Sequence, residues 1–317
     1  MLQFINLASS DETVDVYLLE ADDNLINKVA DYTLMLADSS GDSEVNEGDY
    51  KIVFTESGSD TIIAQKNDIS IDEGDALSYV LVSYVVAGSQ KNRYSIVELS
   101  ENGSRRLTNQ AADGHLRVVN GISNTSGISI ATGDRTNIIE SNIELGALSA
   151  DILVPISSSG EAESTTVFIL NSDDGSQLES TTLNIYADEQ ILLISAGDTR
   201  STVSVNETDE DLRIIDTHVK ILISHAIYAE NDDALQVLII EEGGNPDSYD
   251  TELSVSYLDS ESYEVEAGNY DLYIYNSSAE LLLEYTLYNL QEGDVVNLVT
   301  TDFETGGSPY QIAEYVN

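Results

Sequence analysis

Three stretches of the chain repeat one pattern of short strands, and this repeat is the strongest constraint on the fold. Each copy opens with an apolar strand that runs into a polar turn, at residues 2–10, 116–124 and 219–227. The copies begin 114 and 103 residues apart, a spacing typical of whole domains rather than of solenoid repeats. We therefore expect three tandem domains of similar fold.

The later part of each copy repeats turns that lead into strands. Gly48-Asp49-Tyr50 in copy one and Gly268-Asn269-Tyr270 in copy three place a glycine before an alternating strand, where its backbone freedom suits a turn. A further turn at 72–75 and 291–294, with Asp188-Glu189-Gln190 at the matching place in copy two, precedes a nearly continuous apolar run. About seven short strands per copy without an amphipathic helix are typical of an immunoglobulin-like sandwich.

The sequence thus predicts an all-β chain of three tandem immunoglobulin-like antiparallel β-sandwich domains. We place them at residues 1–105, 114–205 and 217–317. The second copy is the most divergent and has 1 tyrosine, against 6 in the first copy and 11 in the third. Short polar links at 103–113 and 206–211 predict an articulated rod of domains.

The charge of the chain excludes whole classes of partner. It has 58 Asp and Glu against 12 Lys and Arg, a net charge of -46. Nucleic acid is excluded as a partner because affinity for phosphates comes largely from Lys and Arg, and anionic membrane surfaces are disfavoured for the same reason. Self-repulsion is relieved where salt shortens the screening length, so we expect saline or divalent-rich surroundings.

The turn after the opening strand has a recurring motif. Copy one has Ala8-Ser9-Ser10-Asp11 followed by Val14-Asp15-Val16-Tyr17, and copy three retains Ser224-His225-Ala226. These motifs resemble DUF4397, a bacterial and archaeal family of unknown function. The family proline is missing from all three copies, and copy two departs further from the pattern. The resemblance implies immunoglobulin-like sandwiches on exported or surface proteins, and it brings no established activity.

The N-terminal sequence bears on localisation. Met1 is followed at once by a predicted strand, without the basic and apolar segments of a signal peptide. The chain has no cysteine, and it has no run of 18 apolar residues that could span a membrane. We expect an extracellular or cell-surface protein whose leader has been removed, with a cytoplasmic protein as the alternative.

Catalytic motifs are missing from the sequence. Two of its three histidines, His115 and His218, lie just before the opening strands of copies two and three. The third, His225, lies in the turn that resembles DUF4397. We expect a ring nitrogen of His225 to bond the turn backbone. No Gly-x-Ser-x-Gly elbow, phosphate-binding glycine loop or zinc motif occurs. The sequence therefore predicts a protein that is not an enzyme.

Calcium is the one ion that the sequence suggests, because carboxylates clustered on loops suit it. The candidate ligands are Asp209, Glu210 and Asp211 in the second link, together with Asp232 and Asp233. A cation in the link would stiffen the joint between copies two and three. Solvated turn acids are the alternative, since no Asp-x-Asp-x-Asp-Gly loop is present.

Tyrosines in the third copy suggest a contact surface. In the strand from Tyr270, residues 270, 272 and 274 share one face, which leaves Tyr273 and Tyr275 on the other face with Asp271. Tyrosine suits both sandwich packing and contact with a partner. We expect Tyr273 and Tyr275 either to pack against a second sheet or to bind a partner.

Three functions remain open from the sequence. The first is a noncatalytic extracellular or cell-surface structural protein, a rod of three domains that displays or connects something. The second is a carbohydrate- or protein-binding module with domain three as its contact domain. The third is a subunit of an extracellular filament or matrix, held by strand addition at open sandwich edges. Glycan, surface protein and self-association are the corresponding partners.

Overall fold

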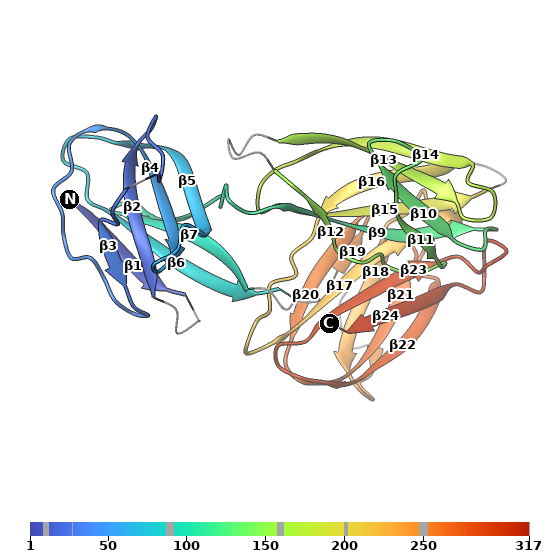
Figure 1. The fold of residues 1–317 in the computed structure, drawn as a ribbon. Coiled ribbons are helices and arrows are strands. Elements are labelled where there is room, and N and C mark those ends of the chain that lie inside the picture. The colour runs from blue at the N-terminus through green and yellow to red at the C-terminus, as the bar shows by residue number, and fades with distance from the viewer. Residues whose placement is uncertain are drawn as a thin grey trace. The chain divides into compact units, whose positions relative to one another are not determined.

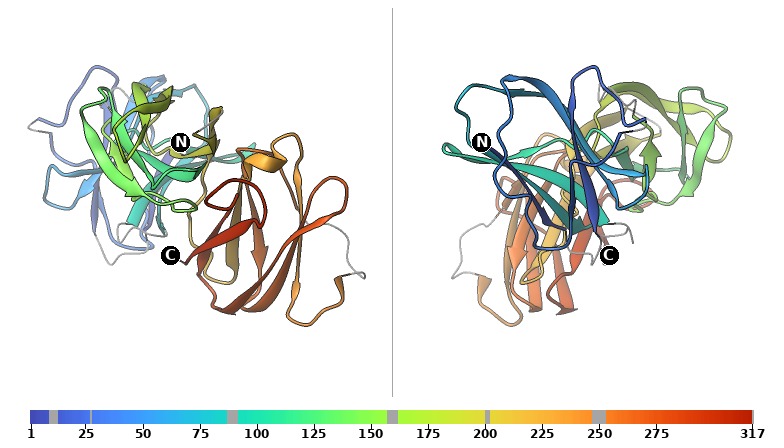
Figure 2. Two further views of the ribbon diagram at one scale, coloured as in Figure 1. Left: turned by 90° about the vertical axis from the view of Figure 1, so that its right-hand side faces the viewer. Right: turned by 60° about the vertical axis from the view of Figure 1, so that its left-hand side comes forward.

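The computed structural model describes residues 1–8, 13–26, 28–86, 92–156, 162–199, 202–246 and 253–316. Within them the chain is almost entirely β, with a 3-10 turn at Tyr228–Glu230 (η1). Six four-stranded sheets form three sandwiches, coloured blue to cyan, green to yellow and orange to red in Figures 1 and 2. The predicted fold class is confirmed. Residues 9–11 of the DUF4397-like turn lie outside the described residues.

The first sandwich contains strands at the predicted positions and one more, because residues 103–107 of the predicted link 103–113 form a strand that pairs with the strand before it. They are β1 (Leu2–Leu7), β2 (Val14–Glu20), β3 (Tyr32–Leu34), β4 (Gly48–Glu56), β5 (Ile62–Ile71), β6 (Leu77–Val85), β7 (Asn92–Ser100) and β8 (Gly103–Leu107). One sheet has the order β1-β6-β7-β8 and the other β3-β2-β4-β5. The inward residues of both sheets meet in one core, in which Phe4, Phe54 and Tyr79 are buried.

The second sandwich repeats this plan. Its strands are β9 (Gly114–Ser123), β10 (Ile128–Thr132), β11 (Ile138–Ile143), β12 (Ile152–Val154), β13 (Glu163–Asn171), β14 (Gln177–Ile185), β15 (Gln190–Asp198) and β16 (Val203–Asp209). They form sheets in the orders β12-β9-β15-β16 and β11-β10-β13-β14.

The third sandwich follows the same plan again. Its strands are β17 (Val219–Ala226), β18 (Leu235–Glu241), β19 (Leu253–Val255), β20 (Ser260–Val265), β21 (Gly268–Tyr275), β22 (Leu281–Leu290), β23 (Val295–Thr301) and β24 (Gln311–Val316). The orders are β20-β17-β23-β24 and β19-β18-β21-β22. In each sandwich the opening strand pairs in parallel with a late strand, β1 with β6, β9 with β15 and β17 with β23. The long connections between these strands allow the parallel direction, so the sheets are not purely antiparallel.

The described chain divides into two compact units. The first comprises Met1–Gly114, Val154–Glu163 and Ile185–Glu189, and the second comprises the remainder, including the whole third sandwich. The second and third sandwiches therefore share a unit. The prediction of a polar link at 206–211 is wrong, because β16 continues to Asp209 and Glu210 is 5% exposed.

Apolar side chains of both sandwiches join them within the second unit. Val119, Leu192 and Ile194 of the second sandwich pack with Ala226 and Val299 of the third, and all five are buried. The backbone approaches closely at Gly121, where a Cβ atom would come 2.5 Å from the Cβ of Ala226. A joint of this kind is a packed interior. It corrects the prediction of an articulated link between copies two and three.

Candidate functional site

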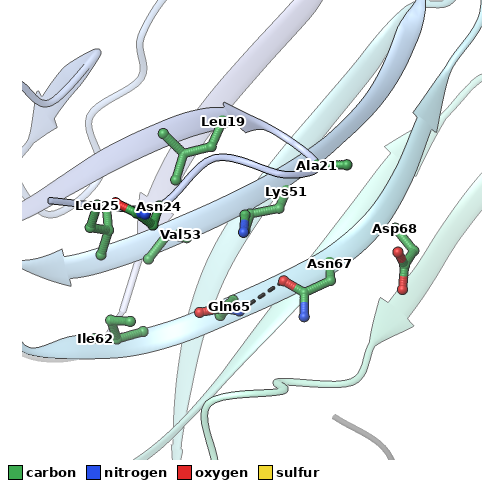
Figure 3. Close-up of a pocket in the computed structure, with 10 residues that line it drawn as sticks. All are labelled: Leu19, Ala21, Asn24, Leu25, Lys51, Val53, Ile62, Gln65, Asn67 and Asp68. Carbon is green, nitrogen blue, oxygen red and sulfur yellow. Dashed lines mark hydrogen bonds between the residues drawn. The ribbon is translucent and has the colours of Figure 1, made fainter. Parts of the chain in front are cut away.

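A hollow on the outer face of the sheet β3-β2-β4-β5 is the candidate binding site of the first sandwich (Figure 3). Its volume of about 520 Å³ falls in the range typical of small-ligand sites. It has both apolar and polar walls. The residues that line it are Leu19, Ala21, Asn24, Leu25, Lys51, Val53, Ile62, Gln65, Asn67 and Asp68.

The alternation of β4 explains why these side chains reach the outer face. Ile52 and Phe54 point into the core of the sandwich, so Lys51 and Val53 point away from it. The loop after β2 forms one wall, where Leu25 packs on Leu19 and Val53. In this loop Asn24 accepts a hydrogen bond from the backbone N–H of Ile26, at 3.0 Å.

Strand β5 supplies the amide side chains of the hollow and bends beside it. Gln65 donates a hydrogen bond through Nε2 to Oδ1 of Asn67, at 2.8 Å (Figure 3). The register between β4 and β5 shifts between Tyr50 and Ile52, and Asp68 opposite this irregularity has a φ of 54°. Such a bulge re-aims side chains on a sheet face.

The ammonium group of Lys51 is available to a ligand. In the described part of the chain, the ammonium group of Lys51 lies within 4.0 Å of no carboxylate and forms no side-chain hydrogen bond. Most cations of this acidic chain are already in ion pairs, as Lys28, Arg93, Arg105, Arg106, Arg117, Arg213 and Lys220 are. Lys51 is therefore a cation held beside amides and apolar groups without its own counter-ion.

The chemistry of the hollow suits binding rather than hydrolysis. Amide and ammonium groups hydrogen-bond hydroxyl groups, while Leu19, Leu25 and Val53 offer an apolar surface. Asp68 is the single carboxylate among the lining residues, whereas glycoside hydrolysis uses a pair of carboxylates. This site was not among those that the sequence predicted. A rare lysine at an outward position of an alternating strand was the available signal.

His225 has the structural role that the sequence predicted. It is fully buried, its Nδ1 accepts a hydrogen bond from the backbone N–H of Ile227 at 3.3 Å, and its Nε2 donates to the carbonyl of Asp233 at 3.2 Å. Burial lowers the pKa of His225 to about 4, although the backbone contacts of Asp233 and Glu230 oppose this shift. The imidazole is thus neutral at physiological pH.

The other two histidines have partners of their own. His115 Nδ1 lies 2.8 Å from a carboxylate oxygen of Asp151, and His218 Nδ1 lies 2.9 Å from the hydroxyl of Thr217. Within the described ranges, no group of three or more His, Asp or Glu side chains is placed to hold a metal ion.

Two acids of the predicted calcium site, Glu210 and Asp211, are paired with basic side chains. Glu210 is buried against Arg117, whose Nε donates to it at 2.8 Å. Burial alone would raise the pKa of Asp211, but hydrogen bonds from Arg213 and Lys220 outweigh it and hold that pKa well below its usual value. Asp209 and Asp232 are exposed, and Asp233 is half-buried. Calcium binding at these residues stays a prediction.

Tyr273 and Tyr275 share the face opposite Tyr270, as the strand pattern predicts, and this is the outer face of the sheet β19-β18-β21-β22. The alternative that they pack against the second sheet is therefore wrong. Tyr270, Leu272 and Ile274 of the same strand point into the core, and both outer tyrosines are half-buried. Burial raises the pKa of Tyr273, and the carboxylates of Glu284 and Asp271 raise it further. Their contact with a partner stays a prediction.

A charged cluster within the first unit involves a turn that the sequence marked. Asp188 has a φ of 61°, like the glycine at the equivalent turn of the third sandwich, Gly293 with a φ of 88°. Its carboxylate accepts hydrogen bonds from Arg106 and from the hydroxyl of Tyr84, and Arg93 lies 4.0 Å away. This cluster holds the turn to the first sandwich.

Comparisons with known proteins give no family. No family model matches the chain, and no curated protein matches it, so the resemblance to DUF4397 stays a prediction. In the described residues, no helix is long and apolar enough to cross a membrane.

Three solved structures resemble the fold at 8–11% identity. A family CBM26 module from Eubacterium rectale Amy13K, solved with maltoheptaose, has a TM-score of 0.22 and matches 63% of this chain and 97% of its own. The Bacillus anthracis TIE protein has a TM-score of 0.21, and the match covers 91% of this chain and 51% of that protein. A proposed cell adhesion protein from Bacteroides ovatus has a TM-score of 0.16, and the match covers 100% of this chain and 96% of that protein. These TM-scores carry no argument about function.

Proposed function

We propose that this chain is a noncatalytic extracellular or cell-surface binding protein, and that the hollow of the first sandwich binds a carbohydrate. The observation that carries the proposal is the combination of an unpaired lysine, amide side chains and an apolar wall in one hollow of about 520 Å³. Sugars present hydroxyl groups on their edges and C–H groups on their faces, and this lining matches both.

The site differs from the contact domain that the tyrosines of the third copy suggested. In the first sandwich, hydrogen-bonding groups converge on a hollow from β4, β5 and the loop after β2. Tyr273 and Tyr275 instead stand on a sheet face beside Asp271 and Glu284. We therefore assign sugar binding to the first sandwich.

A glycan array followed by calorimetry with the full chain tests this proposal. We expect Lys51→Ala to weaken binding of the sugar found by about tenfold or more, because a hydrogen bond to a charged group contributes about 1.5–3 kcal/mol. Gln65→Ala should weaken it several-fold, because a hydrogen bond between neutral groups contributes about 0.5–1.5 kcal/mol. Lys66→Ala is the matched control, since Lys66 lies on β5 but does not line the hollow. Unchanged affinity in the Lys51 and Gln65 variants, or no sugar bound at all, would refute the site.

Cellular location is tested separately from binding. We expect the protein on intact cells to be labelled by a reagent that does not cross membranes. Protection of the protein until the cells are lysed would contradict an extracellular location and would leave the sugar site to be judged by the calorimetry alone.

A further inference from the structure

The outer edge of β22 in the third sandwich is an open strand edge. β22 is the last strand in the order β19-β18-β21-β22, and its inner edge pairs with β21 from Tyr270↔Leu287 to Tyr275↔Leu281. In the ranges that the structure describes, no other strand or loop forms backbone hydrogen bonds along its outer edge. Such a row of free N–H and C=O groups is a template for strand pairing.

The equivalent edge in the first sandwich is closed by the chain itself. β5 holds the place of β22 in its sheet, and Asn109 donates to the carbonyl of Ile63 while its side-chain oxygen accepts from the N–H of Gln65, both at 3.0 Å. Gln110 then donates its backbone N–H to the carbonyl of Gln65 at 2.8 Å. The two residues thus occupy the position of a neighbouring strand, which β22 lacks.

The composition of β22 also differs from that of an edge protected by charge. Its ten residues, Leu281–Leu290, include a single charged side chain, Glu284, in a chain that is 22% charged. Leu281 is 46% exposed and Tyr288 is 60% exposed. The equivalent strand of the second sandwich is β14. It has the polar Asn184 at the exposed position where β22 has the aromatic Tyr288, and each follows a buried leucine.

A hollow runs beside this edge and carries negative charge. Its volume is about 650 Å³, and its lining consists of Glu284, Tyr285, Thr286, Tyr288 and Glu314. The hydroxyl of Tyr285 donates a hydrogen bond to the Glu314 carboxylate at 2.6 Å. Burial, together with that carboxylate, raises the pKa of Tyr285 to about 12. The lining therefore combines two carboxylates with two aromatic rings and no cation.

We propose that the outer edge of β22 is a docking site for an extended peptide segment that carries lysine or arginine side chains and adds to the sheet as a further strand. Main-chain hydrogen bonds to the open edge supply affinity in this mode, and side-chain contacts supply specificity. The cations of the segment pair with Glu284 and Glu314, and its apolar side chains cover Leu281 and Tyr288. A second copy of this chain fits poorly, because it brings a net charge of -46 and another Glu284.

Calorimetry of the full chain with synthetic peptides tests the proposal. The probe is a peptide of ten residues in which lysine alternates with valine, and its control is the same peptide with N-methyl groups on alternate residues, which keeps the charge but blocks strand pairing. We expect the unmodified peptide to bind at least tenfold more tightly than the methylated one. Glu284→Gln should weaken binding several-fold, whereas Glu179→Gln in β14 should leave it unchanged.

Hydrogen exchange of the wild-type chain gives a second measurement that depends on no variant. We expect the amides of 281–290 to gain protection when the lysine peptide is added. Equal affinity for both peptides, an equal effect of the two glutamate variants, or unchanged exchange in β22 would overturn the proposal. Concentration-dependent dimerisation without peptide, with protection of the same amides, would overturn it in favour of self-association.

Discussion

One buried polar position occurs in all three sandwiches and is filled by Asn6, Asn120 and His225, each fully buried. Asn6 accepts a hydrogen bond from the backbone N–H of Ala8 at 3.1 Å, and Asn120 accepts one from Ile122 at 2.9 Å. His225 does the same for Ile227. The stretches 2–10, 116–124 and 219–227 differ in register by two residues, since Asn6 and Asn120 are their fifth residues and His225 is the seventh. Neighbouring apolar strand residues look alike, so sequence similarity alone does not fix this register.

This position predicts a pH-dependent stability that one substitution removes. The pKa of His225 is about 4 in the folded chain against 6.5 for the free side chain, so the unfolded chain binds more protons between these values. The contribution of neutral His225 is complete above pH 6.5 and is lost as the pH falls toward 4, by about 3 kcal/mol. Urea unfolding from pH 7.5 to 4 measures it.

The control for that measurement is His225→Asn, which installs the residue of the other two sandwiches. Asparagine does not titrate, so the difference in unfolding free energy between wild type and variant should shrink as the pH falls from 6.5. Carboxylate titration affects both proteins and cancels in the difference. A difference independent of pH would show that His225 does not carry this effect.

At the scale of elements, β9 and the residue after β16 determine how the second and third sandwiches join. Arg117 of β9 is 6% exposed and forms an ion pair with Glu210, and its Nη2 lies 3.5 Å from Oδ1 of Asn297 in β23. Burial raises the pKa of Glu210 despite the opposing effect of Arg117. The residues predicted as a calcium-binding link are thus part of a packed joint.

Removing one partner of this ion pair should destabilise the second unit strongly. We expect Arg117→Ala to lower the unfolding free energy by about 3 kcal/mol, because Glu210 would remain buried without a counter-ion. The double variant Arg117→Met with Glu210→Leu should recover most of the loss, since apolar pairs often replace buried ion pairs without cost. Thermal unfolding of all three proteins measures this, and an Arg117→Ala protein as stable as wild type would contradict the prediction.

At the scale of the whole molecule, net charge dominates the response to solvent. The chain has a net charge of -46, and repulsion between its carboxylates opposes folding. Exposed charges repel over a screening length that falls from about 10 Å at 0.1 M salt to about 3 Å at 1 M. The stability of both units should therefore rise with salt.

Thermal unfolding in increasing NaCl tests this response and the calcium prediction together. We expect the unfolding temperature to rise by about 5 °C or more between 0.1 and 1 M NaCl, which corresponds to about 1–2 kcal/mol for units of this size. CaCl2 and MgCl2 at matched ionic strength separate screening from binding. An additional rise with CaCl2 alone would support a calcium site, and its loss in Asp209→Asn would locate that site. Equal curves in all three salts would exclude one.

Local chain properties made much of the fold predictable. Alternation along the strand put Tyr270 and Tyr273 on opposite faces, and the turn around Gly48 marked the start of β4. Which of the two faces points into the core was visible only in the structure. These features depend on strand geometry and on backbone angles within a few residues. The three sandwiches and the structural role of His225 therefore followed from the sequence.

Only the tertiary structure decided which surfaces meet. The residues of 206–211 looked like a solvated link because they are polar, yet Glu210 finds Arg117 from 93 residues away. Lys51 and Gln65 line one hollow only because β4 pairs with β5 in a bulged register. Both the packing of the second sandwich on the third and the lack of a counter-ion at Lys51 in the described chain depend on segments that are distant in sequence. Composition and spacing alone therefore determined the three repeated folds, and long-range packing determined the joint between two of them and the candidate sites.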